Sequence, residues 1–410
     1  MTNVVGIISE YNPFHNGHAY HLEQSKELAK ADYVIAVVSG NFVQRGNVSL
    51  INKWDKADMA LTNGADLVIE LPTVYSISSA ENFAYGAVKI LDSLNIVDYI
   101  SFGTELDDIN ILDKCADILY KQPQKFVNLL NHELSKGLSF PKARENALLM
   151  YLNDIRKYSN VLSSPNNILA IEYLKALKKL RSHIKPIVIK RKNAGYNDLE
   201  ITNNFASATA IRKKLIDNKP AGLSKLMPPN SYRVLYNSIQ KGHYVKDIIS
   251  FEKEIIFTLR KMSIKEISNL PDVTEGLEHS IKNAANSCNT IDEFMNIIKT
   301  KRYTNTRIQR ILLYALLGIT KDDMKTSTKV QPYIRVLGMN KKGKDLISVI
   351  SRSNPNLNII TSVKKYIDSN PNKALLNMLN TDINATNTYT LGYEKDSWSN
   401  LDFTHNMIVY

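Results

Sequence analysis

A short polar segment near the start of the chain carries residue types that suit phosphate chemistry. His15 and His18 flank Gly17 directly before a run with helical spacing, and the segment follows an apolar, β-branched run at residues 4–9. Asn16 and Gly17 permit a tight turn into a helix, and Gly17 lets a ligand approach the backbone closely. The first N–H groups of a helix favour bound phosphate, and imidazoles can donate hydrogen bonds to its oxygens as charge develops. This pattern predicts a nucleotidyl-transfer site.

The amino-terminal half alternates two kinds of segment, as expected for βα units on a parallel sheet. Short β-branched runs predict strands at residues 4–9, 33–39, 66–71, 97–102 and 186–190. Apolar residues at helical spacing predict helices at residues 19–31, 80–94, 109–120, 124–134 and 167–180. We therefore expect an α/β, doubly wound parallel-sheet domain, Rossmann-like, in which ligands sit beyond the carboxyl ends of the strands where strand order reverses.

The second half of the chain has a different pattern. From about residue 248 the strand signal fades and helical periodicity dominates, and a Pro-rich stretch before it suits a linker. We expect residues 1–218 to form the nucleotide domain, 219–247 a linker and 248–410 a mainly α-helical domain. Residues 377–388 are rich in Asn and Thr, which suggests a loop.

Composition and charge narrow the class of protein. The chain has 410 residues, 44% of them hydrophobic and 22% charged, as in a folded globular protein of two or three domains. Cys115 and Cys288 lie far apart without CxxC or Cys/His spacing, so we expect neither a disulfide framework nor a structural zinc site. No signal peptide or bilayer-spanning apolar run is visible, which predicts a cytoplasmic protein without a membrane partner. The net charge of +12 favours polyanionic partners, although many basic proteins simply carry solvated lysines.

Two motifs resemble those of a known superfamily. His15-Asn16-Gly17-His18 after a strand is similar to the HxGH signature of the nucleotidyltransferases and class I aminoacyl-tRNA synthetases, and residues 207–212 resemble their late Ser/Thr-rich motif. At a helix start, the hydroxyls of Ser207 and Thr209 can hold the β and γ phosphates while Arg212 neutralises the departing pyrophosphate. A lone hexapeptide of this kind is often an ordinary capped helix, but its place downstream of HxGH favours a function.

Further segments are similar to the bacterial tRNA(Met) cytidine acetate ligase family, and they extend over nearly the whole chain. They are residues 39–46, 53–54, 70–72, 101–105, 164–173, 190–191, 194–196, 301–304 and 333–338. Two departures are visible. Asn47-Val48-Ser49 stands where Glu-Pro and a small residue are expected, and Asn197 stands where a His commonly follows Gly-Tyr. These departures concern substrate contacts rather than the nucleotide chemistry.

The resemblance implies a two-step reaction. Acetate attacks the α-phosphate of ATP, which is carried with Mg²⁺, to give acetyl-adenylate and pyrophosphate. The N4 amine of the wobble cytidine in elongator tRNA(Met) then takes the acetyl group, forming N4-acetylcytidine. Since no carboxylate cluster identifies metal ligands, we expect phosphates and water to hold the Mg²⁺.

Residue roles follow from the positions of the motifs. The expected catalytic residues are His15, His18 and Arg212. Besides Ser207 and Thr209, the resemblance implies ATP contacts from Ile7, Ile8, Ser9, Glu10, Tyr11, Asn12, Pro13, Phe14, His15, Asn16, Gly17, His18, Ala19, Tyr20, Gly103, Asn166, Asn167 and Arg191.

Basic residues outside these motifs suggest RNA contacts. A basic segment that ends in Lys190 and Lys192 can track a phosphate backbone. One stripe of a later helix interleaves cations with aromatics, which suits single-stranded RNA loops: Tyr303, Arg307, Arg310 and Tyr314. An ordinary solvated surface explains both groups equally well.

Three other functions stay open on the sequence alone. An adenylyltransferase acting on a small phosphorylated cofactor precursor needs no large basic domain, so the long helical region disfavours it. An acetate ligase acting on a protein-bound thiol shares the acetate chemistry, and no motif excludes it. A non-catalytic RNA-binding protein is disfavoured because His15, His18 and Arg212 are intact. The sequence leaves the oligomeric state unknown.

Overall fold

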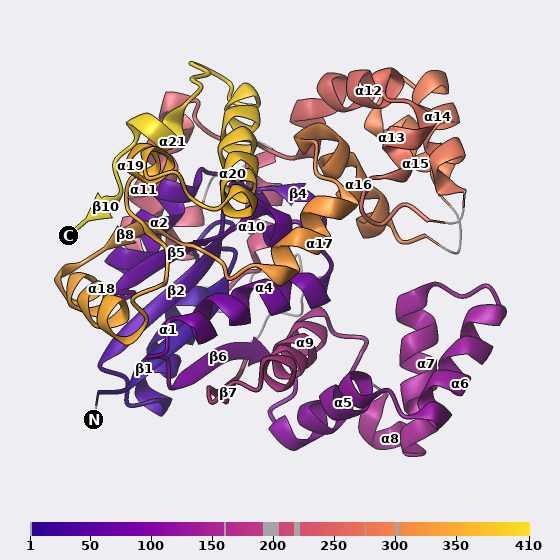
Figure 1. Cartoon of the computed structure of the whole chain (residues 1–410), viewed down its shortest axis with the longest axis horizontal. Helices are drawn as coiled ribbons and strands as arrows, with labels where there is room; N and C mark the ends of the chain where they lie inside the picture. Colours follow the sequence, from indigo (N-terminus) through magenta and orange to yellow (C-terminus); the bar gives the residue numbers. More distant parts are fainter. Residues whose placement is uncertain (1, 160, 192–204, 217–221, 275, 300–302) are drawn as a thin grey trace.

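The sheet at the centre of the fold places the ends of its strands around one point. The computed structural model describes residues 2–159, 161–191, 205–216, 222–274, 276–299 and 303–410. Within these residues, eight strands form one sheet in the order β10-β8-β5-β2-β1-β6-β7, with β9 paired to β8 (Figure 1). The strands are β1 (Val4–Ser9), β2 (Tyr33–Ser39), β5 (Leu67–Leu71), β6 (Tyr99–Thr104), β7 (Lys185–Lys190), β8 (Ile334–Met339), β9 (Ile359–Ile360) and β10 (Ile408–Val409).

The first five of these strands run parallel, as the sequence predicts. From β1 the chain proceeds outward to β2 and β5, and then returns to the other side of β1 with β6 and β7. Strand order therefore reverses between β1 and β6, and this is where such sheets bind ligands. The predicted doubly wound α/β class is confirmed.

Helices cover both faces of the sheet because side chains on each strand alternate in direction. Val5 and Ile7 pack with α1 (Asn16–Leu28) and α2 (Lys53–Thr62). Val4 and Ile8 pack in the second core, which includes α4 (Ala80–Ser93), α9 (Pro165–Leu180) and α18 (Lys341–Ser353). Gly6 lets α4 approach closely, since a Cβ there would lie 2.7 Å from Leu91 Cδ1.

The predicted elements match the structure with small shifts. The strands at 4–9 and 33–39 have the predicted bounds, whereas β6 begins two residues later than expected. Helix α1 begins at Asn16 rather than at residue 19, because the His15 side chain caps it. The residues between the two histidines therefore form its first turn.

Two groups of helices stand away from the sheet on the right of Figure 1. The first contains α5 (Ile109–Lys121), α6 (Gln124–Ser135), α7 (Phe140–Leu152) and α8 (Ile155–Tyr158). The second contains α12 (Glu252–Lys261), α13 (Ile264–Ser268), α14 (Leu277–Ser287), α15 (Ile291–Ile298) and α16 (Asn305–Leu317). No helix in the described part of the chain is both long and apolar enough to cross a membrane.

Short elements complete the fold. Strands β3 (Phe42–Val43) and β4 (Asn47–Val48) form a small antiparallel hairpin. The remaining helices are α3 (Thr73–Ser76), α10 (Ala208–Ile216), η1 (Leu223–Lys225), α11 (Pro229–Lys241), η2 (Ile248–Phe251), α17 (Lys321–Lys329), α19 (Val363–Asp368), α20 (Lys373–Leu391) and α21 (Leu401–Thr404).

The last quarter of the chain, expected to belong to a separate, mainly α-helical domain, also contributes strands to the sheet. Strand β8 joins β5 in antiparallel direction, and β9 and β10 join β8, so this part of the chain extends the central sheet. Residues 377–388 form part of helix α20 rather than a loop. Their composition misleads because several polar side chains of α20 are buried and hydrogen-bonded, among them Asp382 and Thr386.

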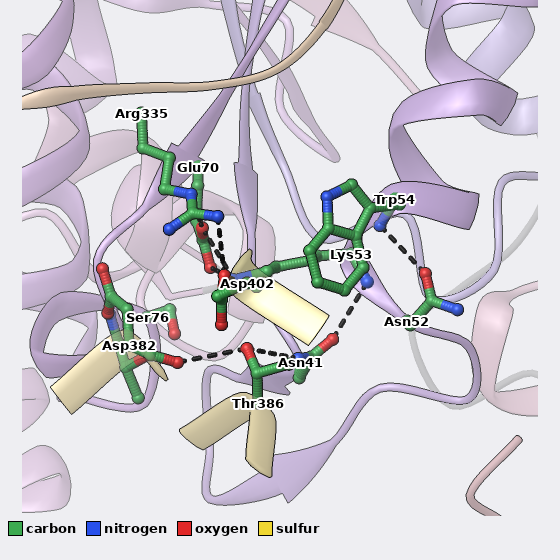
Figure 2. Close-up of polar contacts among 12 residues, drawn as sticks. Asn41, Asn52, Lys53, Trp54, Glu70, Ser76, Arg335, Asp382, Thr386 and Asp402 are labelled. Carbon is green, nitrogen blue, oxygen red and sulfur yellow. Dashed lines mark hydrogen bonds and ion pairs between the residues drawn. The ribbon is translucent and has the colours of Figure 1, made fainter. Parts of the chain in front are cut away.

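A buried network of charges fastens this returning segment to the sheet (Figure 2). Lys53 Nζ lies 3.0 Å from a Glu70 carboxylate oxygen and 2.7 Å from an Asp402 oxygen, and all three side chains are buried. Arg335 pairs with the same two carboxylates, from 3.3 and 2.6 Å. The network thereby joins α2, β5, β8 and α21 by compensating charges.

Candidate active site

A cavity opens beyond the carboxyl ends of β1, β6 and β7, at the reversal of strand order. Six stretches of chain contribute to its described wall: the end of β1 with the start of α1, the loop after β3, α4, the end of β6, the region from α9 to β7, and the start of α10. Of the site residues predicted from the sequence, those that line the cavity are Ile8, Ser9, Glu10, Tyr11, Asn12, His15, Gly17, His18, Tyr20, Gly103, Asn166, Lys190, Arg191, Ser207, Thr209 and Arg212.

The two histidines of the HxGH motif form a compact stacked pair. His15 is the N-cap of α1, and its Nδ1 accepts a hydrogen bond from Gly17 N at 3.0 Å. His18 Nδ1 accepts from His15 N at 3.2 Å, and the two ring centroids lie 3.8 Å apart. Gly17 is required by this packing, because a Cβ there would lie 2.8 Å from His15 Cε1.

These contacts fix the protonation of both rings. Burial, with Arg191 and Arg212 nearby, lowers the pKa of His15 to about 3, and burial with His15 nearby lowers the pKa of His18 well below its usual value. Both rings are therefore neutral near pH 7. Since each Nδ1 accepts a hydrogen bond, the proton of each ring is on Nε2. The pair can thus donate hydrogen bonds to an anion without carrying charge.

The residues before the motif hold it in place. Asn12 bridges to the segment after β4, because its side chain donates to Val48 O and accepts from Leu50 N at 3.2 and 2.8 Å. Phe14 is buried against Tyr11 and His18, with ring centroids 4.7 and 5.5 Å away. Asn12 and Phe14 therefore position the histidines.

The late motif lines the same cavity as HxGH. Arg212 Nη1 donates to Asn12 O at 2.7 Å, which ties α10 to the loop that precedes the histidines. Its Nη2 donates to Thr209 Oγ1 at 3.2 Å, and Ser207 Oγ accepts from Ala210 N at 3.1 Å as part of the helix start. The two motifs are thus joined in space, with two hydroxyls and a guanidinium of the late motif on the cavity wall.

A third wall comes from the strand ends. Gly103 on β6 faces Arg191, whose Cγ would lie 3.4 Å from a Cβ at this position. Asn166 lines the cavity and donates to Glu105 Oε1 at 2.6 Å. Asn167 does not line it, because its buried side chain accepts from the N–H groups of Glu105 and Leu106.

Some other predicted residues also lie away from the cavity. Asn16 points to η1, where its backbone N and side-chain Nδ2 donate to Leu226 O and Lys225 O. Ile7 packs in the core between the sheet and α1 and α2, and Pro13, Phe14 and Ala19 are likewise absent from the described lining. Lys192 and Asn197 lie outside the described residues. Roles for these residues in binding ATP or RNA stay predictions.

Sequence reasoning did not select several residues of the wall. His21 lies one turn beyond His18, so the spacing of the three histidines could have indicated it. Gln44 and Arg45 come from the loop after β3, whose segment carries the family resemblance. The apolar wall gives no local signal, because its residues follow ordinary core spacing: Phe83, Phe102, Leu169, Tyr173, Ile189 and Phe205.

The arginines predicted to contact RNA are engaged within the protein. Arg307 donates from Nε and Nη2 to Asp272 O at 2.9 and 2.7 Å and lies over the Tyr303 ring. Arg310 Nε pairs with Asp272 at 2.7 Å and its side chain is 11% exposed. Tyr314 is buried, so the predicted stripe does not extend to it. RNA contact by Arg307 and Arg310 stays a prediction. Lys190, beside the cavity, is 64% exposed and pairs with Asp107.

Comparison with known proteins agrees with this geometry. The model of the HIGH Nucleotidyl Transferase family matches residues 2–402. A protein of Thermoanaerobacter sp. (strain X514) named tRNA(Met) cytidine acetate ligase is 47% identical over 405 residues, which cover 99% of each chain. One of the same name from Clostridium tetani is 45% identical, with 95% of each chain covered.

Solved structures extend the likeness to three dimensions. Thermotoga maritima TmcAL without ligand superposes with a TM-score of 0.95 at 33% identity, covering 100% of this chain and 99% of the other. The same protein bound with alpha-thio ATP superposes with a TM-score of 0.92. The stacked histidines at the start of α1, the late motif tied to them by Arg212, and these matches along the whole chain lead to one assignment. The chain belongs to the tRNA(Met) cytidine acetate ligases of the HIGH nucleotidyl transferase family.

Proposed function

We propose that this protein is an ATP-dependent tRNA acetate ligase, which activates acetate as acetyl-adenylate and transfers the acetyl group to N4 of the wobble cytidine of elongator tRNA(Met). The observation that carries the proposal is the neutral pair His15 and His18 at the start of α1, set in a cavity that Arg212 also lines. The proposal is supported by a protein named tRNA(Met) cytidine acetate ligase, which is 47% identical to this chain over 99% of each chain.

The first half-reaction follows from the donors on the cavity wall. When an acetate oxygen attacks the α-phosphate, negative charge grows on the phosphate oxygens. The Nε2–H groups of His15 and His18 are fixed donors for that charge, and fixed donors need no reorganisation. Arg212, Ser207 and Thr209 line the same cavity, and we propose that they hold the β and γ phosphates and the departing pyrophosphate.

The cavity also suits the rest of the nucleotide and the reactive intermediate. Its apolar side is formed by aromatic residues from α4, β6 and α9, which offer a dry surface for a base: Phe83, Phe102 and Tyr173. Gly103 leaves a slot beside Arg191. A mixed anhydride survives only where water is excluded, so the apolar side of the cavity suits it.

The protein offers few ligands for Mg²⁺. The described residues contain no group of three or more His, Cys, Asp or Glu side chains that could hold a metal ion, and Glu10 is the single carboxylate among the described residues of the cavity wall. Mg²⁺ in proteins usually keeps several waters and binds through substrate phosphates. We therefore propose that Mg²⁺ arrives with ATP, held by the phosphates and water.

The second half-reaction needs an RNA at the mouth of the cavity. The net charge of +12 favours association with a polyanion. Lys190 is exposed beside the cavity, where it can contact an RNA phosphate. Since tRNA and ATP are both present in the cytoplasm, we place the reaction there.

The test is to incubate the protein with ATP, radiolabelled acetate and bacterial tRNA and to identify labelled nucleosides by mass spectrometry. Labelled N4-acetylcytidine that requires both ATP and His18 is the expected result. Formation of AMP and pyrophosphate from another small acid or a cofactor precursor, with no label in tRNA, contradicts the acetate ligase and leaves a nucleotidyltransferase of another specificity.

A further inference from the structure

A single carboxylate stands out on a cavity wall that is otherwise suited to anions. The described wall includes Arg45, Lys190, Arg191, Arg212 and three histidines, but Glu10 is its one acidic side chain. ATP, acetate and pyrophosphate are all anions, so a carboxylate at this place opposes their binding. Its presence needs a reason that the first half-reaction does not supply.

Glu10 is held rigidly. It is the first residue after β1, and its Oε1 accepts a hydrogen bond from Gln44 N at 2.8 Å. A neutral glutamine oxygen could accept the same bond, so anchoring the loop after β3 does not require a negative charge. Burial raises the pKa of Glu10, against the opposing effect of Arg45, Lys56 and Arg212. A carboxylate with a raised pKa is a better proton acceptor than an ordinary one.

The second half-reaction has a need that this group meets. The N4 amine of cytosine is a hydrogen-bond donor, and carboxylates of Glu and Asp are the side chains that accept from it in base recognition. The same amine must lose a proton when it becomes an amide nitrogen. None of the other described groups on the wall is an anionic acceptor, since the remaining charged side chains there are cations and the histidines are neutral donors toward the cavity.

We propose that Glu10 recognises the N4 amine of the acceptor cytidine and is the general base of acetyl transfer, an inference that rests on the function proposed above. The N4 lone pair forms a bond to the carbonyl carbon of acetyl-adenylate. The bond from that carbon to the phosphate oxygen breaks, and its electron pair leaves with AMP. The proton from N4 passes to the Glu10 carboxylate, which returns it to water after the products leave.

The test separates the two half-reactions of the full-length enzyme in the variant Glu10→Gln, which keeps an oxygen for Gln44 N. Acetate-dependent ATP–pyrophosphate exchange reports adenylate formation. Transfer is measured in a single turnover from preformed acetyl-adenylate to tRNA. We expect transfer to fall by about 100-fold or more, the usual loss for a general base, with a much smaller change in exchange. Glu23→Gln on the exposed side of α1 is the matched control and should affect neither rate.

The pH profile gives a second readout. Transfer by the wild type should rise with pH through the pKa of Glu10, which lies above its ordinary value of 4.5, and this limb should vanish in Glu10→Gln. The groups that face Glu10 are Arg45 and Gln44 after β3, Lys56 on α2, Tyr173 on α9 and Arg212 on α10. Burial lowers the pKa of Lys56 to about 7 and the Glu10 charge opposes that effect, so loss of this charge in the variant lowers the pKa of Lys56 further.

Three results overturn the proposal. Equal loss in both half-reactions assigns Glu10 to the nucleotide site, and undiminished transfer leaves it as an anchor of Gln44 alone. If the wild type forms acetyl-adenylate but transfers nothing to RNA, the proposed function fails and the role of Glu10 fails with it. This last failure is seen before any variant is made.

Discussion

At the scale of single residues, the site depends on how two imidazoles share one helix start. The Nδ1 atoms of His15 and His18 each accept a hydrogen bond from a backbone N–H, so the Nε2–H groups are oriented before any ligand arrives. Preorganised donors act mainly on the charge that develops in the transition state. The histidines should therefore influence the rate of adenylate formation more than the affinity for ATP.

Replacing either histidine tests this role. We expect His15→Ala and His18→Ala each to slow acetate-dependent ATP–pyrophosphate exchange by about 100-fold or more, as on removing one oxyanion donor. His132→Ala, on the exposed face of α6, should leave exchange unchanged. Exchange at the wild-type rate in either cavity variant would contradict the role.

Spacing along the chain reveals the polar half of the site and leaves the apolar half hidden. The HxGH and late motifs could be predicted because each lies within six consecutive residues, and the structure ties them together through Arg212. Phe83 and Tyr173 could not, because each looks like an ordinary core residue of its own helix. Asn166 and Asn167 are adjacent and alike in sequence, and only the fold decides which one faces the cavity.

At the scale of elements, the charge network decides where the returning segment docks. Lys53 on α2 lies between Glu70 on β5 and Asp402 on α21 and is fully buried. Removing one partner of a buried pair leaves a charge without compensation, at a cost of roughly 3–5 kcal/mol.

We therefore expect Lys53→Met to lower the free energy of unfolding by about 3 kcal/mol or more, as measured by urea denaturation. Lys121→Met breaks the exposed pair with Asp117 on α5 and should cost less than about 1 kcal/mol. Similar losses in the two variants would show that the buried network contributes no more than a surface ion pair.

Element prediction succeeds where burial is uniform and fails where polar groups are buried. β2 has the predicted bounds because its apolar run is flanked by polar residues. Composition predicts a loop at residues 377–388, because Asn and Thr favour loops when exposed, and this prediction is wrong for helix α20. In the structure, its Asp382 accepts from Thr73 N and from Tyr333 Oη, so tertiary hydrogen bonds outweigh composition.

At the scale of the whole molecule, helix α16 of the second helical group packs against the loop between β3 and β4. Gly46 has a φ of +75°, and a Cβ there would lie 2.4 Å from Arg310 N on α16. The same loop presents Gln44 N to Glu10. Packing between Gly46 and α16 thus links the helices after residue 252 to the site, a link that no local pattern predicts.

Gly46→Ala should therefore lower the free energy of unfolding more than a substitution that only strains the backbone. Gly137, between α6 and α7, has a φ of +77° with nothing within 4 Å of a Cβ, and Gly137→Ala should cost about 1–2 kcal/mol from the left-handed conformation. Gly46→Ala should cost about 1–3 kcal/mol more through overpacking and should also slow tRNA acetylation. Urea denaturation and the acetylation assay measure both effects. Equal losses of stability and unchanged acetylation would argue against the link.

The buried histidines should also make the stability of the molecule depend on pH. Burial with Arg191 nearby lowers the pKa of His15 to about 3 and that of His21 to about 4, from an ordinary value of 6.5. The folded state favours the neutral rings, so the unfolded chain binds more protons as the pH falls below 6.5. The contribution is present in full above pH 6.5 and is lost on acidification, by up to about 1.4 kcal/mol per pH unit for each histidine until its folded pKa is reached.

Carboxyl groups titrate over the same range, and burial raises the pKa of Asp55 to about 6, which acts in the opposite direction. Comparing the wild type with a single variant removes the contribution of these carboxyl groups, because both proteins share it. In urea denaturation at pH 7, 6 and 5, His21→Gln should reduce the pH slope of the unfolding free energy by up to about 1.4 kcal/mol per unit below pH 6.5. Gln can still hydrogen-bond to Ser101, which lies 3.3 Å from His21 Nε2. An unchanged slope would mean that His21 takes up its proton as readily in the folded protein as in the unfolded chain. Burial and the charge of Arg191 would then not lower the pKa of His21.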